Sequence, residues 1–277
     1  MRGRPHKSVL SSGWNGSGGV LGCRCCRGTY YISCNDAIDR GSLAQMLQPK
    51  TKIGSPYVIA GMKKARLRGG KVICGWEANG GFLMGSDISR NARVLKELPT
   101  RDAVLPILCV LFAAISRRLS LIELFARLPQ RYSRAALLKG IPRPLSLKLL
   151  QQFFLDDSRI QEVIFEQDRT TSLDGDKILL VAEKSKVEKA EEVRHQLQQF
   201  FTPALGFGTI ARLNYTDGVR ITFSNGDIGH FRPSGNADEL RIYGVADTQE
   251  RADAIAEEGV REPHGILRRM EKAITAG

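Results

Sequence analysis

The spacing of apolar residues changes partway along the chain, and this change restricts the folds that the chain can adopt. In residues 29–116, short β-prone runs such as 71–74 alternate with stretches of helical spacing such as 56–66. This alternation is typical of an α/β/α domain with a mixed, mostly parallel sheet. From residue 219 on, β-prone runs follow one another, and Asn225-Gly226 is a strong hairpin signal. The second pattern predicts a smaller α+β domain with an antiparallel sheet.

The 277 residues are enough for two ordinary domains. Between the two patterns lies a basic, leucine-rich connector whose prolines break helices, and we place the domain boundary near Ile141. The N-terminal segment is rich in Gly, Ser, Arg and Cys and has little periodicity, so we expect it to be disordered. The expected regions are this unmatched segment, residues 1–28, a first domain, residues 29–140, and a second domain, residues 142–277.

The longest apolar run, residues 103–115, is too short to cross a bilayer and predicts a buried helix. Thr100 is the expected N-cap of this helix, with Asp102 in its first turn. No apolar stretch follows the basic residues at the N-terminus, so no secretory signal is expected. These features predict a cytoplasmic protein that does not contact a membrane.

The net charge of +12 suits an anionic partner. Its distribution argues against nucleic acid, because residues 1–28 and 29–153 carry +5 and +13 whereas residues 154–277 carry −6. The chain also lacks the interleaved aromatic and basic residues of RNA-binding sheets. A small anion bound in a cleft is favoured, and a nucleic-acid binder is kept only as the third hypothesis.

Neither the cysteines nor the histidines predict a metal site. Three of the six cysteines crowd together as Cys23, Cys25 and Cys26, and no second pair follows at the spacing of zinc ligands. The four histidines have no partner at such a spacing either. We expect free thiols in a reducing compartment and no metal ligands.

A turn that suits a phosphate group lies between two predicted strands, with the sequence Arg232-Pro233-Ser234-Gly235-Asn236. Ser and Gly in a tight turn let successive backbone N–H groups converge on one anion. The guanidinium, hydroxyl and amide side chains add further donors. From the residues alone, an ordinary β-turn beside a surface arginine explains the pattern equally well.

A second polar loop, Glu77-Ala78-Asn79-Gly80, follows an apolar strand. A carboxylate accepts hydrogen bonds and an amide both accepts and donates them, so Glu77 and Asn79 suit adjacent sugar hydroxyls. The glycines allow a ligand to approach closely. Taken alone, the loop is also explained as a glycine-rich turn with a solvated glutamate.

In this order, the two loops resemble those of the α-D-phosphohexomutase superfamily, which includes bacterial phosphomannomutases and phosphoglucomutases. Glu77-Ala78-Asn79-Gly80 resembles the sugar-recognition loop, usually E-x-S-G. The turn that begins at Arg232 resembles the phosphate-binding loop, usually R-P-S-G-T-E-P. The resemblance covers the chain from about Tyr30 to the C-terminus, and the flanking sequences that also fit are residues 52–54, 101–104, 217–223 and 240–243.

The resemblance implies a specific division of labour. Superfamily members have four domains: the first carries a phosphorylated serine, the second a Mg²⁺ loop reading D-G-D-G-D-R, the third binds the sugar and the fourth the non-reacting phosphate. Residues 29–140 then correspond to domain three and residues 142–277 to domain four, and the ligand is a mannose or glucose phosphate. The implied sugar contacts are Glu77, Asn79 and Lys52, and the implied phosphate contacts are Arg232, Ser234, Gly235 and Asn236.

The chain departs from the superfamily pattern in its catalytic parts. No T-A-S-H-N-P-type serine loop is found, and the acidic turn Asp174-Gly175-Asp176 lacks the third Asp and the Arg of the metal loop. Asn236-Ala237-Asp238 stands where the family has T-E-P, and Asp238 places a carboxylate near the expected phosphate. We therefore expect no catalytic residue in this chain and no bound Mg²⁺, although Mg²⁺ serves the full-length members.

The leading hypothesis is a fragment of a phosphomannomutase/phosphoglucomutase that is inactive by itself. The alternative is a non-catalytic phosphosugar-binding remnant, or an inert product of a truncated gene. In both cases the face of domain three that normally packs on domain two is expected to be exposed, which predicts association through that face.

Overall fold

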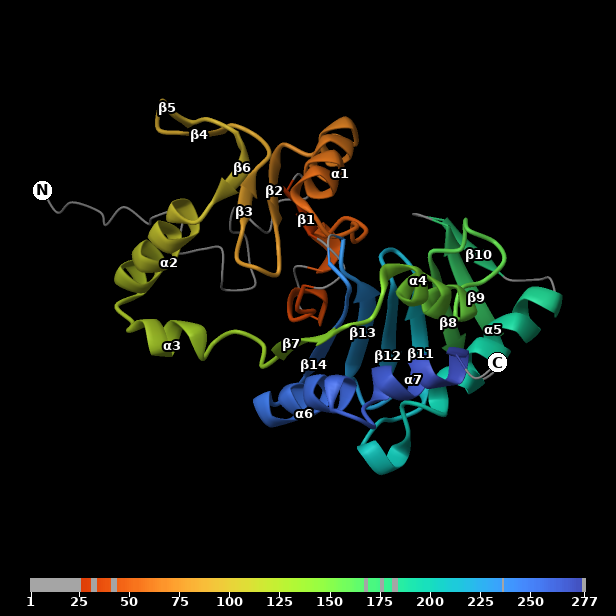
Figure 1. Ribbon diagram of the computed structural model, residues 1–277. Coiled ribbons are helices and arrows are strands. Elements are labelled where there is room, and N and C mark those ends of the chain that lie inside the picture. Colours follow the sequence, from red (N-terminus) through yellow and green to blue (C-terminus); the bar gives the residue numbers. More distant parts are fainter. Residues whose placement is uncertain are drawn as a thin grey trace, which may run out of the picture. The chain divides into compact units, whose positions relative to one another are not determined.

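The computed structural model describes residues 26–30, 34–40, 44–166, 169–174, 177–180, 184–235 and 237–275 (Figure 1). They form two compact units that divide between Gln130 and Arg131. The two units have separate sheets and separate cores, so each is described by itself.

The first unit contains a four-stranded sheet in the order β1-β2-β3-β6 and a two-stranded ribbon of β4 and β5. Its strands are β1 (Cys26–Tyr30), β2 (Val72–Trp76), β3 (Phe82–Met84), β4 (Ile88–Arg90), β5 (Arg93–Leu95) and β6 (Leu98–Asp102). Its α-helices are α1 (Ser55–Leu67), α2 (Val104–Arg117) and α3 (Leu121–Phe125), and two 3₁₀ turns lie at Ile38–Arg40 and Ala44–Met46.

The four-stranded sheet is mixed, as predicted, but it is not mostly parallel. β1 and β2 are parallel, whereas β3 pairs antiparallel with both β2 and β6. The short turn over residues 77–81 explains why β2 and β3 are antiparallel, because strands joined by so short a turn cannot run parallel. Residues 26–28, which were expected to lie outside either domain, belong to β1, and residues 1–25 lie outside the described part of the chain.

α1 covers the sheet through a small core. Its buried residues Val58, Met62 and Ala65 recur at the three- and four-residue spacing of one helix face. They cluster with Ile73 of β2 and Leu83 of β3, both of which are fully buried. Pro56 in the first turn suits the start of a helix, because its fixed φ angle is already helical.

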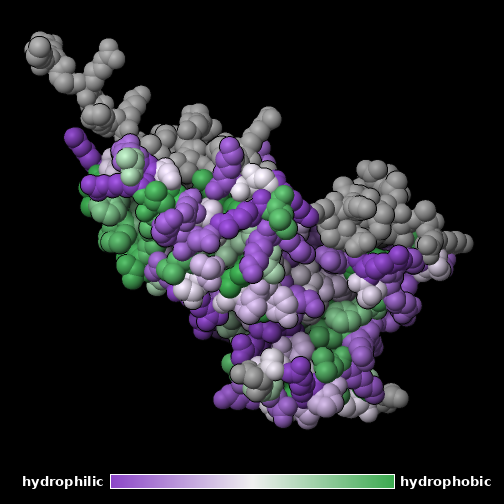
Figure 2. All heavy atoms as spheres, turned by 90° about the horizontal axis from the view of Figure 1, so that it is seen from above, coloured by the Kyte–Doolittle hydropathy of each residue, from purple (hydrophilic) through white to green (hydrophobic). Residues whose placement is uncertain are grey.

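α2 is not the buried helix that its apolar sequence predicted. Its buried residues are Ala113 and Ala114, which cluster with Leu124 of α3. Large apolar side chains around them remain exposed, and Figure 2 shows them within a green area at the left of the view. We call these residues the α2–α3 surface: Val104, Ile107, Leu108, Leu111, Phe112, Ile115, Leu121, Ile122 and Phe125.

An apolar helix is buried only where another element covers it, and sequence does not show whether one does. Among the helices that the structure describes, none is long and apolar enough to cross a membrane.

The start of α2 also differs from the prediction. Thr100 lies in β6 and does not cap the helix. The carboxylate of Asp102 accepts hydrogen bonds from the N–H groups of Val104, at 2.8 Å, and Leu105, at 3.4 Å. Asp102 thus satisfies two of the N–H groups that a helix N-terminus leaves unpaired.

The second unit has one sheet of eight strands in the order β10-β9-β8-β11-β12-β13-β14-β7, with every neighbouring pair antiparallel. This confirms the predicted antiparallel sheet. The strands are β7 (Tyr132–Lys139), β8 (Glu162–Glu166), β9 (Arg169–Asp174), β10 (Lys177–Leu180), β11 (Ile210–Asn214), β12 (Val219–Phe223), β13 (Ile228–Pro233) and β14 (Glu239–Ala246). The helices are α4 (Arg143–Gln152), α5 (Lys184–Gln198), α6 (Gln249–Val260) and α7 (Ile266–Thr275), with a 3₁₀ turn at Pro203–Leu205.

One face of this sheet forms a continuous core with all four helices. The sheet contributes buried residues such as Ile221, Phe231 and Ile242, and residues of α4, α5, α6 and α7 join the same cluster. Phe231 packs edge-on against Phe153, with ring centroids 6.1 Å apart, and stacks on Phe201 at 6.4 Å. Because side chains alternate along a strand, the opposite face is left to residues such as those flanking Phe231.

The two units divide earlier in the chain than the boundary expected near Ile141, because β7 belongs to the second unit. Its residues pair along β14, from Tyr132 opposite Ala246 to Lys139 opposite Glu239. The segment is rich in Ala and Leu, which favour helices, so the pairing partner and not local propensity decides its structure.

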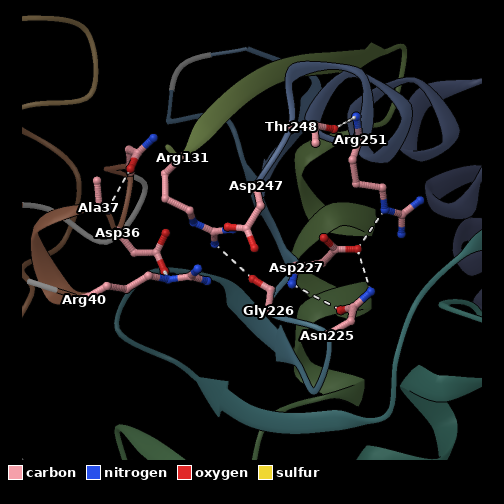
Figure 3. A network of polar contacts seen from close by, with 11 residues as sticks. Asp36, Ala37, Arg40, Arg131, Asn225, Gly226, Asp227, Asp247, Thr248 and Arg251 are labelled. Atoms are coloured by element: carbon pink, nitrogen blue, oxygen red, sulfur yellow. Dashed lines mark hydrogen bonds and ion pairs between the residues drawn. The ribbon is translucent and has the colours of Figure 1, made fainter. Parts of the chain in front are cut away.

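A polar network fixes the hairpin between β12 and β13 (Figure 3). Asp227 accepts a hydrogen bond from Arg251 of α6 at 2.7 Å, and Asn225 donates to the same carboxylate at 3.0 Å. Gly226 adopts φ 85°, which an Asn-Gly turn requires. Thr248 caps α6 by accepting from the N–H of Arg251 at 3.1 Å.

Candidate functional site

The turn between β13 and β14 holds the residues that the sequence predicted for a phosphate. Arg232 lies near the end of β13, Ser234 is buried and Gly235 is exposed. The N–H of Ser234 donates to the carbonyl of Glu239 at 2.8 Å, which closes the turn. The fourth predicted residue, Asn236, lies outside the described residues.

Two arginines face each other at the base of this turn. Arg232 is directly opposite Arg241 in the register of β13 and β14, so both side chains lie on the face opposite the core. Like charges in this position destabilise a sheet unless a counter-charge offsets them. Glu239 lies 3.4 Å from Arg241 and offsets its charge in part, while Arg232 reaches the hydroxyl of Tyr243 at 3.5 Å.

The Nε atoms of Arg232 and Arg241 are both buried and, within the described chain, have no hydrogen-bond partner. A buried donor without an acceptor is costly, and more so when it carries charge. Oxygen atoms of a bound anion would satisfy both donors. This pair of arginines therefore makes the turn a candidate anion site.

His230 lies beside the arginines and has a structural partner. Its Nε2 atom lies 2.6 Å from the carbonyl oxygen of Asp217, and its ring stacks on Tyr243 with centroids 5.5 Å apart. The stack positions the Tyr243 hydroxyl that Arg232 contacts.

Asp238 does not point its charge at this candidate site. Its carboxylate accepts a hydrogen bond from the backbone N–H of Arg143, the first residue of α4, at 3.1 Å. A carboxylate at a helix N-terminus is favoured by the unpaired N–H groups and the helix dipole. The departure from the T-E-P pattern is thereby accommodated.

The loop between β2 and β3 holds Glu77 and Asn79. Glu77 is buried, and its carboxylate accepts from the hydroxyl of Ser55 and forms an ion pair with Arg101 at 2.7 Å. Asn79 is exposed, and its side-chain oxygen accepts from the N–H of Gly81 at 3.1 Å. The alternative explanation of this loop, a glycine-rich turn with a solvated glutamate, is therefore wrong, because the carboxylate is buried and has two partners inside the unit.

Lys52 is exposed and lies three residues before Ser55 at the start of α1. The Ser55 hydrogen bond to Glu77 thus brings the segment that carries Lys52 beside the sugar loop. Gly80 adopts φ 88° in this turn, a conformation that favours glycine.

Sequence reasoning missed three residues of these sites: Ser55, Arg101 and Arg241. The first two hold Glu77 through contacts between segments far apart in the chain. Arg241 could have been predicted from the sequence. The alternation of side chains sets the register of the hairpin, and this register places Arg241 opposite Arg232.

Comparisons with known proteins identify the family of this chain. Residues 30–132 match the family model described as Phosphoglucomutase/phosphomannomutase, alpha/beta/alpha domain III. The phosphomannomutase of Salmonella muenchen is 38% identical over 228 residues, which cover 82% of this chain and 38% of that protein. The phosphomannomutase of Sinorhizobium fredii is 32% identical over 229 residues, which cover 83% and 40%.

This chain belongs to the phosphoglucomutase/phosphomannomutase family. It spans about two fifths of the length of the curated relatives it matches. The region that matches domain III of the family ends at residue 132, next to the division between the two units. Among solved structures, the chain is similar to Aspergillus fumigatus N-acetylphosphoglucosamine mutase in complex with GlcNAc-6P and magnesium, with a TM-score of 0.48 and 14% identity over 95% of this chain and 43% of that one.

The described residues contain no group of three or more His, Cys, Asp or Glu side chains that could hold a metal ion. Residues 175 and 176 of the acidic turn lie outside the described residues.

Proposed function

We propose that this chain supplies the substrate-recognition part of a phosphomannomutase/phosphoglucomutase, an isomerase that moves a phosphoryl group between O6 and O1 of a hexose phosphate. In this proposal the first unit is domain three and holds the sugar, while the second unit is domain four and holds the non-reacting phosphate. The observation that carries the proposal is the pair of buried, unpartnered Nε atoms of Arg232 and Arg241 on one sheet face, within the described chain.

The phosphate is bound by charge and by backbone donors. Arg232 and Arg241 offer buried guanidinium donors. Hydrogen bonds to a bound anion would offset the free-energy cost of burying these donors. The hydroxyl of Ser234 and the backbone of Gly235 and Asn236 complete the cradle, in the manner of turns that bind anions.

The sugar is bound by the loop of the first unit. Ser55 and Arg101 hold the carboxylate of Glu77 in one orientation. The Arg101 side chain is 56% exposed, so it has room to rotate away from Glu77. A sugar hydroxyl would then replace Arg101 as the donor to the Glu77 carboxylate. Asn79 and Lys52 lie at the surface and add a hydroxyl contact and a positive charge.

By itself the chain does not catalyse the reaction. Phosphoryl transfer in this family needs a nucleophile that carries the phosphoryl group and a metal that offsets its charge. The 277 residues contain neither the serine loop nor the metal loop. Binding of substrate without added stabilisation of the transition state gives no rate acceleration.

The test is an activity and binding assay on the purified chain, shown by mass to be this sequence and free of host mutase. We expect no conversion of mannose 1-phosphate to mannose 6-phosphate with Mg²⁺ and a hexose bisphosphate, and measurable binding of mannose 6-phosphate by calorimetry. Turnover that disappears in Arg232→Ala would overturn the proposal. Absence of both turnover and binding would favour the alternative, an inert product of a truncated gene.

The α2–α3 surface is the part of the first unit that we propose is covered by another protein domain. Its nine large apolar side chains are each at least 41% exposed, and monomeric proteins seldom expose so many together. In a full-length mutase the cover would be domain two, and without it the chain associates with other molecules. We further propose a cytoplasmic location, with no nucleic-acid or membrane partner.

A further inference from the structure

The carboxylate of Glu77, the residue proposed to contact the sugar, is not open to a ligand in the structure. Its side chain has an exposed fraction of 0%, and its Oε2 atom is buried. Nη2 of Arg101 lies 2.7 Å from this oxygen, and the Arg101 side chain is itself 56% exposed. A ligand that approaches from solvent therefore meets the guanidinium of Arg101 before it reaches the carboxylate.

The side chain of Arg101 reaches both of the sugar contacts proposed for this loop. A Cβ placed on Gly81 would lie 3.2 Å from Cγ of Arg101 and 3.3 Å from Oδ1 of Asn79. The aliphatic part of Arg101 thus passes beside the Asn79 side chain, while its guanidinium ends at Glu77. A sugar whose adjacent hydroxyls contact both Glu77 and Asn79 requires the same space.

The ion pair neutralises Glu77 without completing its hydrogen bonds. Ser55 donates to Oε1, whereas Oε2 has no hydrogen bond of good geometry within the described chain, although Nη2 of Arg101 is close to it. A buried acceptor without a hydrogen bond is costly, and an ion pair with a solvated arginine contributes little stability. A sugar hydroxyl supplies the missing hydrogen bond, so exchange of Arg101 for a ligand is favoured.

We infer that Arg101 is a gate residue of the sugar site: in the free protein it occupies the place of the ligand and competes with the sugar for Glu77. The inference rests on the proposed function of this loop and adds a regulation of it. A hexose phosphate must displace the guanidinium before it binds. Because only the open form binds, the measured affinity is lower than the affinity of the open site by the fraction of molecules that are open.

The test is calorimetry on variants of the full chain, with mannose 6-phosphate and inorganic phosphate as separate probes. Arg101→Ala should bind mannose 6-phosphate about fivefold more tightly, the factor that corresponds to about 1 kcal/mol for an ion pair with an exposed partner. Arg101→Gln, which loses the charge but keeps a donor, should show a smaller gain, and Arg101→Lys should resemble wild type. Inorganic phosphate does not reach this loop, so its binding should not change.

Two further variants identify the cause of the gain. In a Glu77→Gln background, Arg101→Ala should give no gain, because no carboxylate is left for the arginine to pair with. Arg93→Ala removes an exposed arginine of β5 in the same unit and is the matched control, with wild-type affinity expected. Circular dichroism establishes that each variant is folded, and if Arg101→Ala is not, the gain in Arg101→Gln decides the test.

Each result supports or overturns the inference. Equal or weaker binding of mannose 6-phosphate after loss of the Arg101 charge would overturn it, and so would a gain that persists in the Glu77→Gln background. If wild type and both neutral variants bind mannose 6-phosphate no more tightly than inorganic phosphate, the proposed function of the loop fails, and the gate fails with it. Specific binding by wild type without a gain in the variants would overturn the gate alone.

Discussion

The two units of this chain bury their apolar residues to very different extents. The second unit has one continuous cluster that joins a sheet face to four helices. The first has a cluster of six buried residues under α1 and a separate cluster of three between α2 and α3. The second unit is thus complete as a folding unit in the described residues, whereas the first keeps a large apolar surface for a neighbour.

Removing a large side chain from the second core should cost the most. Phe231 is fully buried among Phe153 and Phe201. We expect Phe231→Ala to lower the free energy of unfolding by about 3–5 kcal/mol, because the cavity is enclosed on all sides. Urea unfolding followed by circular dichroism measures the change. Leu83→Ala in the first core should cost less, about 2–3 kcal/mol, and equal losses would contradict the comparison.

The second unit should also carry most of the phosphate affinity. We expect Arg232→Ala to weaken hexose 6-phosphate binding by about 1.5–3 kcal/mol, the range for a hydrogen bond to a charged group. Calorimetry on wild type and variant measures it, with Arg212→Ala on β11 as the control. Unchanged affinity would remove Arg232 from the site.

The cap of α2 should matter to the first unit even though the helix is exposed. Asp102→Ala removes an acceptor for two N–H groups and should destabilise the unit by about 1 kcal/mol. Asp102→Asn keeps an acceptor oxygen and should cost a few tenths of that. Thermal unfolding of both variants is the measurement, and identical losses would show that the charge, and not the cap, is responsible.

The sugar loop should affect binding in a way that depends on the ligand. We expect Glu77→Gln and Asn79→Ala each to weaken hexose phosphate binding by about 0.5–1.5 kcal/mol, one ordinary hydrogen bond. Binding of inorganic phosphate should not change, since these residues reach hydroxyl groups. Parallel losses for both ligands would show that the loop has been assigned the wrong role.

The smallest effect on stability is expected at the α2–α3 surface. Phe112 is 54% exposed, so Phe112→Ser should change the free energy of unfolding by less than about 0.5 kcal/mol. It should nevertheless reduce association in sedimentation velocity runs, because it removes apolar area from the exposed patch. Tyr57→Ser, which changes an aromatic of similar exposure on α1, is the control and should leave association as it is.

Local patterns in the sequence were sufficient for the strands of the second unit from residue 219 on. The strand over residues 219–223 and the Asn225-Gly226 turn both depend on neighbours within a few residues. β7 was missed because its pairing with β14 joins segments about a hundred residues apart. The turn between β13 and β14 was predicted for the same local reason, as its strand ends and turn residues are adjacent in the chain.

What the sequence by itself determined is the family, the order of the two loops and the elements whose hydrogen bonds are local. The tertiary structure alone decided that Glu77 is buried against Ser55 and Arg101, that Arg232 faces Arg241, and that α2 stays exposed. The physical reason is common to all three. Burial and the pairing of charges depend on which distant segment packs beside a residue. The periodicity of a single segment does not identify that partner.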